Sequence, residues 1–212
     1  MQIQRAPISI YAEATPNPEV MKFVANKMLI QQDSVEYQNI EEAAPSPLAQ
    51  ELFKQPYVKA VFISGNFIAV SKYNVAEWEE VGQELRLLIA EWLHTGKKVM
   101  KDGEAVVQAM HDSAEAPATD EASVEGDVAA APEELGEIEQ RIIEILDEYI
   151  KPAVAQDGGN IAFVSYENKI VTVQLQGACA GCPSSQLTLN QGIKAILQRM
   201  LPTLVDDVIP TE

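Results

Sequence analysis

A strongly acidic stretch in the middle of the chain divides it into two segments that must fold separately. Between Asp102 and Glu139 there are twelve acidic residues and no lysine or arginine. The part up to Ala131 is rich in alanine, serine and proline and shows no apolar period, a composition that cannot bury enough apolar surface to fold. The sequence therefore predicts three regions: an N-terminal domain over 1–100, an acidic flexible linker over 101–131, and a C-terminal domain over 132–212.

The net charge of −17 argues against binding to nucleic acid or to an anionic membrane surface, because both attract basic patches. The acidic stretch is interpreted as a solvated linker, with a docking tail for a basic partner as the alternative. No apolar run approaches the ~18–20 residues of a transmembrane helix. The first residues also lack the pattern of a secretory signal. We therefore expect a cytoplasmic protein with no membrane partner.

The N-terminal segment is predicted to mix strands and helices. Thr15-Pro-Asn-Pro18 is interpreted as a rigid turn, because each proline fixes φ and disfavours helix at the residue before it. Gly65-Asn66 separates two β-rich runs and predicts a hairpin. The expected strands are Ile8–Glu13, Val20–Val24, Met28–Ile30, Tyr57–Ser64 and Phe67–Lys72. The expected helices are Ser46–Lys54 and one from Trp78 to near His94, whose apolar residues recur at three- and four-residue steps.

The C-terminal segment predicts the order α-β-β-α-β, an α+β fold in which two helices pack on one small sheet. In the run Ile170–Gln176, apolar and polar residues alternate, so one face of this strand should be buried and the other wet. The first helix should begin at Pro132 and bury Leu135, Ile138, Ile142, Ile145, Leu146 and Tyr149. The remaining expected elements are a strand at Ile161–Tyr166, a helix from Ser184 or Ser185 to about Met200, and a strand at Leu204–Ile209.

The chain has only two cysteines, Cys179 and Cys182, in a loop between an expected strand and an expected helix. A disulfide between them would close a very short loop and constrain little. Unpaired N–H groups and the helix dipole at this position favour thiolate over thiol, and thiolates bind metals. Gly177 and Gly181 allow the loop to bend, and Pro183 suits the first position of a helix.

Two thiolates do not complete a metal site, since structural zinc and cubane iron–sulfur clusters commonly take four ligands. The chain offers no further cysteine, and neither His94 nor His111 is expected to be a ligand. The simplest completion is symmetric, with Cys179 and Cys182 of two chains facing each other across a two-fold axis. From the residues alone, a shared iron–sulfur cluster, a shared zinc ion and a redox dithiol remain open.

The region around the two cysteines is similar to the NifU-like (Nfu-type) iron–sulfur scaffold and carrier family. The matching residues are Pro152, Asp157-Gly158-Gly159, the run Leu175–Ser185, Thr188-Leu189 and Gly192-Ile193. Lys194 stands where the family often has glutamate. This position is not a ligand position, so the difference does not affect the expected site. The N-terminal segment resembles the family's N-terminal domain at Glu13–Pro18, Lys22-Phe23, Ser46–Ala49, Leu52-Phe53, Val61-Phe62, Phe67–Val70 and Trp78.

The resemblance implies a homodimer that binds a [4Fe-4S] cluster between its two pairs of Cys179 and Cys182. The cluster would come from iron–sulfur assembly machinery and pass to apo-proteins, which the N-terminal domain would help to dock. Such a protein is a carrier and not an enzyme. The alternative is a thioredoxin-like dithiol/disulfide oxidoreductase that uses the same two cysteines. Four thiolates suit [2Fe-2S] and [4Fe-4S] clusters alike.

Overall fold

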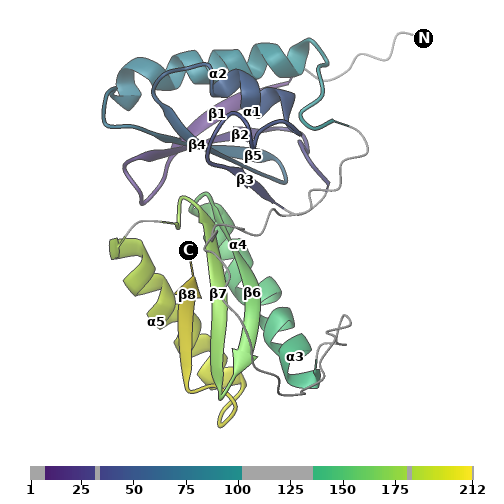
Figure 1. The fold of residues 1–212 in the computed structure, drawn as a ribbon, viewed down its shortest axis with the longest axis vertical. Helices are drawn as coiled ribbons and strands as arrows, with labels where there is room; N and C mark the ends of the chain where they lie inside the picture. The colour runs from purple at the N-terminus through teal and green to yellow at the C-terminus, as the bar shows by residue number, and fades with distance from the viewer. Residues whose placement is uncertain (1–7, 32–33, 102–135, 181–182, 212) are drawn as a thin grey trace, which may run out of the picture.

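The computed structural model describes residues 8–31, 34–101, 136–180 and 183–211, with the backbone alone at 183–188. The predicted linker therefore lies almost entirely outside the described residues. Two sheets, each with its own helices, are arranged end to end (Figure 1). Among the described helices, none is both long and apolar enough to cross a membrane.

The N-terminal sheet has five antiparallel strands in the order β1-β2-β5-β4-β3. Its strands are β1 Ile10–Ala14, β2 Val20–Ala25, β3 Val35–Tyr37, β4 Val58–Ser64 and β5 Phe67–Lys72. The predicted strand at Met28–Ile30 is wrong, because these residues form a loop whose amides bond to the β4–β5 turn at Gly65. The short edge strand β3 was not predicted.

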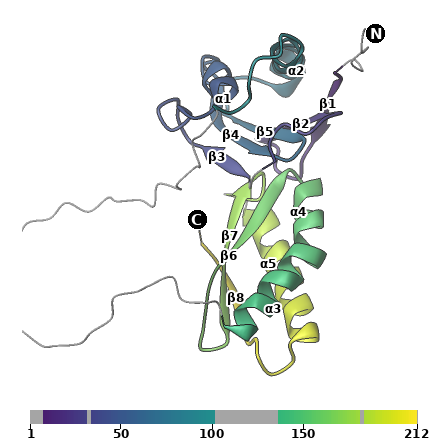
Figure 2. The ribbon, with the colours of Figure 1, turned by 90° about the vertical axis from the view of Figure 1, so that its right-hand side faces the viewer.

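Two helices, α1 Pro47–Leu52 and α2 Trp78–His94, cover one face of this sheet (Figure 2). The predicted helix start at Ser46 is confirmed, since its Oγ accepts a hydrogen bond of 3.2 Å from Ala49 N. The core between the helices and the sheet includes Phe23, Leu48, Val61, Ile68, Leu85 and Ile89.

The first helix of the C-terminal region is interrupted by a π turn. It runs as α3 Glu137–Ile145, the π segment η1 Leu146–Ile150 and α4 Lys151–Gln156. Pro152 is the second residue after this turn and has no N–H to give to a regular helix. The wider turn shifts the helix phase, so the predicted burial of Tyr149 is wrong: it is 46% exposed, whereas Ile150 is buried. The predicted burial of Ile138 is also wrong, since this residue is 36% exposed.

The C-terminal sheet has three strands, β6 Gly159–Glu167, β7 Ile170–Gly177 and β8 Asp207–Thr211, in that order. The helix α5 Pro183–Met200 lies between β7 and β8 in the chain and brings β8 parallel to β7. The last strand begins three residues later than predicted, because the chain first turns at Thr203 with φ of 78°. The predicted order α-β-β-α-β and the α+β class are confirmed.

Candidate functional site

The cysteine loop follows β7 directly and leads into α5, as the sequence predicts. Ala178 N donates to Gly158 O at 3.1 Å, and Ala180 N donates to Gly177 O at 3.0 Å, so the first half of the loop is a hydrogen-bonded turn. Cys179 is placed in this turn. Gly181 and Cys182 lie outside the described residues, and their predicted roles stay predictions.

Gly177 has a backbone conformation and surroundings that leave no space for a side chain. Its φ of +65° belongs to the left-handed region that favours glycine. A Cβ at this position would lie 2.7 Å from Gly158 O and 2.9 Å from Cδ1 of Phe62. The predicted bend at Gly177 is therefore confirmed, and its cause is crowding from two sides.

The Asp157-Gly-Gly159 turn forms one wall around Cys179. Gly158 has a φ of +82°, and a Cβ on Gly159 would lie 2.7 Å from the Cys179 sulfur. Cys179 itself is only 4% exposed and packs into the C-terminal core. The turn thus has a structural role, and it also sets the space available to the thiol.

The other side of the loop is covered by the N-terminal sheet, on the face turned away from α1 and α2. Figure 2 shows the ends of β6, β7 and α4 against this face. We call it the docking face, and define it by Val20, Lys22, Val24, Glu36, Phe62, Phe67 and Ala69. Its apolar members cluster with Ala178 and Ala155 of the C-terminal region. Phe62 and Phe67, with ring centroids 5.9 Å apart, are 1% and 5% exposed.

Polar contacts fix the backbone just before Cys179 to the N-terminal region. Glu36 Oε2 accepts a hydrogen bond of 3.1 Å from Gly177 N, and Asn17 Nδ2 donates to Ala178 O at 3.4 Å. Burial raises the pKa of the Glu36 carboxyl, against the opposing effect of its bond from Gly177. Asn17 belongs to the Thr15–Pro18 turn, which the structure forms as predicted and uses as a contact to the loop.

Lys22 joins the same interface from the middle of β2. Its Nζ donates to the carbonyl oxygens of Ala155 at 2.9 Å and of Gln156 at 3.1 Å, at the end of α4. Nζ also lies 3.5 Å from Glu13 Oε2 and 4.8 Å from the centroid of the Phe67 ring. The ammonium group therefore binds carbonyl oxygens at the C-terminal end of α4, where the helix dipole favours a cation.

Three residues of this interface were not predicted as site residues: Lys22, Glu36 and Phe62. One signal was available: β4 and β5 are apolar at consecutive positions, which is typical of a sheet covered on both faces. A lysine within the apolar run of β2 was a second signal, because a buried lysine needs partners.

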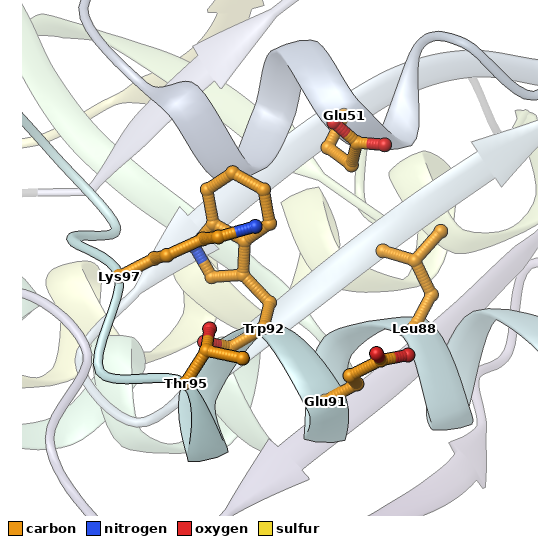
Figure 3. A pocket seen from close by; sticks show the side chains of 6 residues that line it. All are labelled: Glu51, Leu88, Glu91, Trp92, Thr95 and Lys97. Atoms are coloured by element: carbon orange, nitrogen blue, oxygen red, sulfur yellow. The ribbon is translucent and has the colours of Figure 1, made fainter.

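No group of three or more His, Cys, Asp and Glu side chains within the described residues is placed to hold a metal ion. His94 stands in the last turn of α2, with Nδ1 2.7 Å from Ala90 O. A separate hollow lies beside α2, lined by Glu51, Leu88, Glu91, Trp92, Thr95 and Lys97 (Figure 3). Lys97 Nζ stands 4.5 Å from the centroid of the Trp92 ring there, and the hollow is on the helix side of the sheet, away from the cysteine loop.

Two family models match the chain in the two regions described above. The model for the N-terminal domain of the scaffold protein Nfu/NifU matches residues 10–96. The model for the NifU-like domain matches residues 142–208, which include both cysteines.

Curated relatives match both regions together. A protein of Drosophila virilis named "NFU1 iron-sulfur cluster scaffold homolog, mitochondrial" is 34% identical over 95% of this chain and 61% of its own length. The protein of the same name from Drosophila sechellia is 34% identical over 93% of this chain and 63% of its own. The chain thus spans about three fifths of the length of these relatives.

Solved structures match smaller parts of the chain. A NifU-like protein from Saccharomyces cerevisiae is 25% identical over 48% of this chain and 92% of its own, with a TM-score of 0.42. The protein SAV1430 from Staphylococcus aureus is 27% identical over 38% of this chain and 98% of its own, with a TM-score of 0.34. Both TM-scores are below 0.5, so the family relationship rests on the domain models and the curated relatives.

Proposed function

We propose that this chain, which belongs to the Nfu/NifU scaffold family, carries an iron–sulfur cluster as cargo and passes it to apo-proteins. The cluster is bound by Cys179 and Cys182, and two chains complete its ligand set with two thiolates each. We take it to be a [4Fe-4S] cluster held in a homodimer and supplied by iron–sulfur assembly machinery. The related proteins are named as iron–sulfur cluster scaffolds, which supports this assignment.

One observation carries the proposal: Cys179 stands in a turn shaped by glycines on both sides, four residues before the start of a long helix. Gly159 leaves room beside the sulfur, since even a Cβ would come within 2.7 Å of it. Gly177 fixes the turn through its left-handed backbone. A loop that reserves space for a thiol and leads into a helix N-terminus favours a thiolate ligand.

The N-terminal and C-terminal regions divide the work in this proposal. We assign cluster binding to residues 132–212, docking of client proteins to residues 1–100, and their connection to the linker 101–131. Ligand exchange between thiolates needs no general acid, base or nucleophile, so we propose a carrier and not an enzyme. The cytoplasmic location remains a prediction, and the relatives are named as mitochondrial.

Anaerobic reconstitution tests the proposal directly. The full chain is given iron and sulfide, and iron, sulfide and Mössbauer spectra are recorded per dimer. We expect about four irons and four sulfides per dimer, and none in the Cys179→Ala, Cys182→Ala double variant. Ala180→Ser, in the same loop, is the matched control and should keep the cluster. Zinc must be measured in the same samples, because four thiolates also suit that ion.

The alternative function is a dithiol/disulfide oxidoreductase that cycles Cys179 and Cys182. Such an enzyme needs an accessible thiolate, as the carrier does, so the burial of Cys179 at 4% exposure favours neither function over the other. A colourless protein that holds no iron and forms a reversible Cys179–Cys182 disulfide would support this alternative. A brown protein prepared without air would support the carrier.

A further inference from the structure

The docking face contacts the cysteine loop at the two residues before Cys179, whose thiol is buried. Cys179 is buried in the core of its own domain, yet two chains can complete a cluster only if each exposes its thiols. The two residues before Cys179 are those fixed by the N-terminal region: Gly177 by Glu36 and Phe62, and Ala178 by Asn17. The contact therefore stabilises the loop with its thiol turned inward.

The same contact occupies the space that a second chain would need. The N-terminal sheet lies against the end of the C-terminal region where β7 leads into the cysteine loop (Figure 1). Four thiolates on one cluster require the second loop to approach this end to within a few ångströms, since metal–sulfur bonds are about 2.3 Å long. The docking face and a partner loop would therefore compete for this end of the C-terminal region.

The interface between the two regions contains charged and polar groups, as expected of a contact that can form and separate. Beside its apolar centre it carries Lys22 and Glu36, each bonded to backbone groups of the other region. A second polar group joins Ser34 to Asn160 at 2.6 Å and to Gln176 at 3.2 Å. Water can replace these bonds when the regions separate, as is usual for interfaces between domains of one chain.

We infer that the docking face is a latch for the cluster-free cysteine loop: it is docked while the loop is empty and is released when two loops share a cluster. The inference rests on the proposed function. Release exposes Phe62, Phe67, Val20 and Val24 on the N-terminal domain. Cluster loading would thereby uncover an apolar surface at the moment when the protein has cargo to deliver.

Thermodynamic linkage sets how strongly docking and cluster binding oppose each other. If the two exclude each other, docking weakens cluster binding by the same factor by which cluster binding weakens docking. Loss of the Lys22 hydrogen bonds to Ala155 and Gln156 should weaken docking about tenfold or more, as for other charge-assisted bonds. Because both loops of a dimer must be released, the apparent affinity for the shared cluster should rise by up to about a hundredfold.

Lysine acetylation of the full chain tests the latch. Lys22 has a side chain 10% exposed, and Lys59 of the same sheet, at 49%, is the internal reference. Low doses of acetic anhydride are applied to cluster-free and reconstituted protein, and modification is read by mass spectrometry. Without a cluster, Lys22 should react at least about tenfold more slowly than Lys59, and with a cluster its rate should approach that of Lys59.

Matched variants test the coupling without relying on that reagent. Lys22→Glu should release the docked state, so that ¹⁵N relaxation shows the two domains of cluster-free protein tumbling separately. It should also raise the iron retained under competition by a chelator. Lys59→Glu makes the same charge change at an exposed site of the same sheet and should alter neither result. Phe62→Gln provides a second release variant should Lys22→Glu fold poorly.

The outcomes separate the latch from the proposed function. If iron binds between two chains and Lys22 stays protected in the loaded protein, the latch is overturned and the carrier stands. If Lys22→Glu separates the domains but leaves iron retention unchanged, the coupling is likewise overturned. If no iron binds to any variant, the proposed function itself fails, and the coupling with it.

Discussion

The two sheets of this protein differ in how many of their faces are buried. The order of apolar and polar residues along their strands indicates this difference. In β4 and β5, four consecutive residues are buried, so both faces of the N-terminal sheet are covered. In β7, buried Val171 and Val173 alternate with partly exposed Thr172 and Gln174. The first sheet has helices on one side and another domain on the other, whereas the second has helices on one side only.

The two buried faces of the N-terminal sheet are also unlike each other. The helix side is a continuous apolar core that includes Phe23, Val61 and Ile68. The docking face places Lys22 and Glu36 among its apolar residues, each with a partner in the other region. Burial alone does not distinguish a permanent core from an interface, but the charged members do, because each is bonded to backbone groups of the other domain.

The largest expected effect contrasts two phenylalanines that are equally buried, at 1% exposure each, on opposite faces. Phe23→Ala should lower the free energy of unfolding of the N-terminal domain by about 3–5 kcal/mol, because it leaves a cavity in a packed core. Phe62→Ala should lower it by about 1 kcal/mol or less, because most of its contacts are lost by undocking anyway. Hydrogen exchange of β5 amides in the full chain measures both. Equal losses would make the two faces one core and break the comparison.

The next effect contrasts two glycines with left-handed backbones. Gly177→Ala should destabilise the C-terminal domain by about 2–4 kcal/mol, combining left-handed strain with overlap against Gly158 and Phe62. Gly96 has a φ of +71°, but a Cβ added there would meet no described atom within 4 Å, so Gly96→Ala should cost only about 1 kcal/mol. Urea unfolding followed by domain-specific probes gives both values. A cost at Gly177 no larger than at Gly96 would show that the crowding is absent in solution.

The α-β-β-α-β order and the position of the cysteine loop were predictable from the sequence because both depend on local pattern. The alternating residues Val171, Val173 and Leu175 predict the buried face of β7. Gly177, Gly181 and Pro183 predict a loop that leads into a helix. The same pattern predicted a wet Gln176, yet this residue is buried at 8% exposure. Gln176 is buried because it contacts the N-terminal domain, where Ser34 donates a hydrogen bond to its side chain. A local sequence pattern cannot predict a contact between residues 142 positions apart.

The π turn shows a different limit of sequence reasoning. Apolar residues from Ile142 onward follow a helical period, and that period assigns Tyr149 to the buried face. The wider turn before Pro152 moves Ile150 inward instead. The proline was visible in the sequence, but whether a helix breaks, bends or widens before a proline depends on what packs against it.

A smaller effect concerns pH and the charged members of the docking face. The pKa of Glu36 is raised by burial, and further by Glu42, while Gly177 and Gln38 lower it. Docked protein therefore binds more protons than undocked protein between the ordinary and the raised pKa, so docking weakens as pH rises through that window. Glu36→Gln should remove this dependence and tighten docking at neutral pH, by roughly 1 kcal/mol.

The docked fraction at each pH is measured from ¹⁵N relaxation of the cluster-free full chain. Glu42→Gln is the matched control, because Glu42 lies in an exposed turn and does not contact Gly177. It should shift the pH dependence only slightly. A docked fraction that rises with pH in the wild-type protein would contradict the assignment of Glu36 as the titrating group of this interface.

The smallest effect has the opposite sign. Gly192 lies within α5, and an added Cβ would meet none of the described atoms within 4 Å. Gly192→Ala should therefore raise the free energy of unfolding by about 0.5–1 kcal/mol, since alanine loses less backbone entropy than glycine in a helix. The crowded Gly177 and the exposed Gly192 would then respond in opposite directions to the same added methyl group. Loss of stability at Gly192 would mean that α5 is covered in solution, and cross-linking of the cluster-free chain would show whether a second copy covers it.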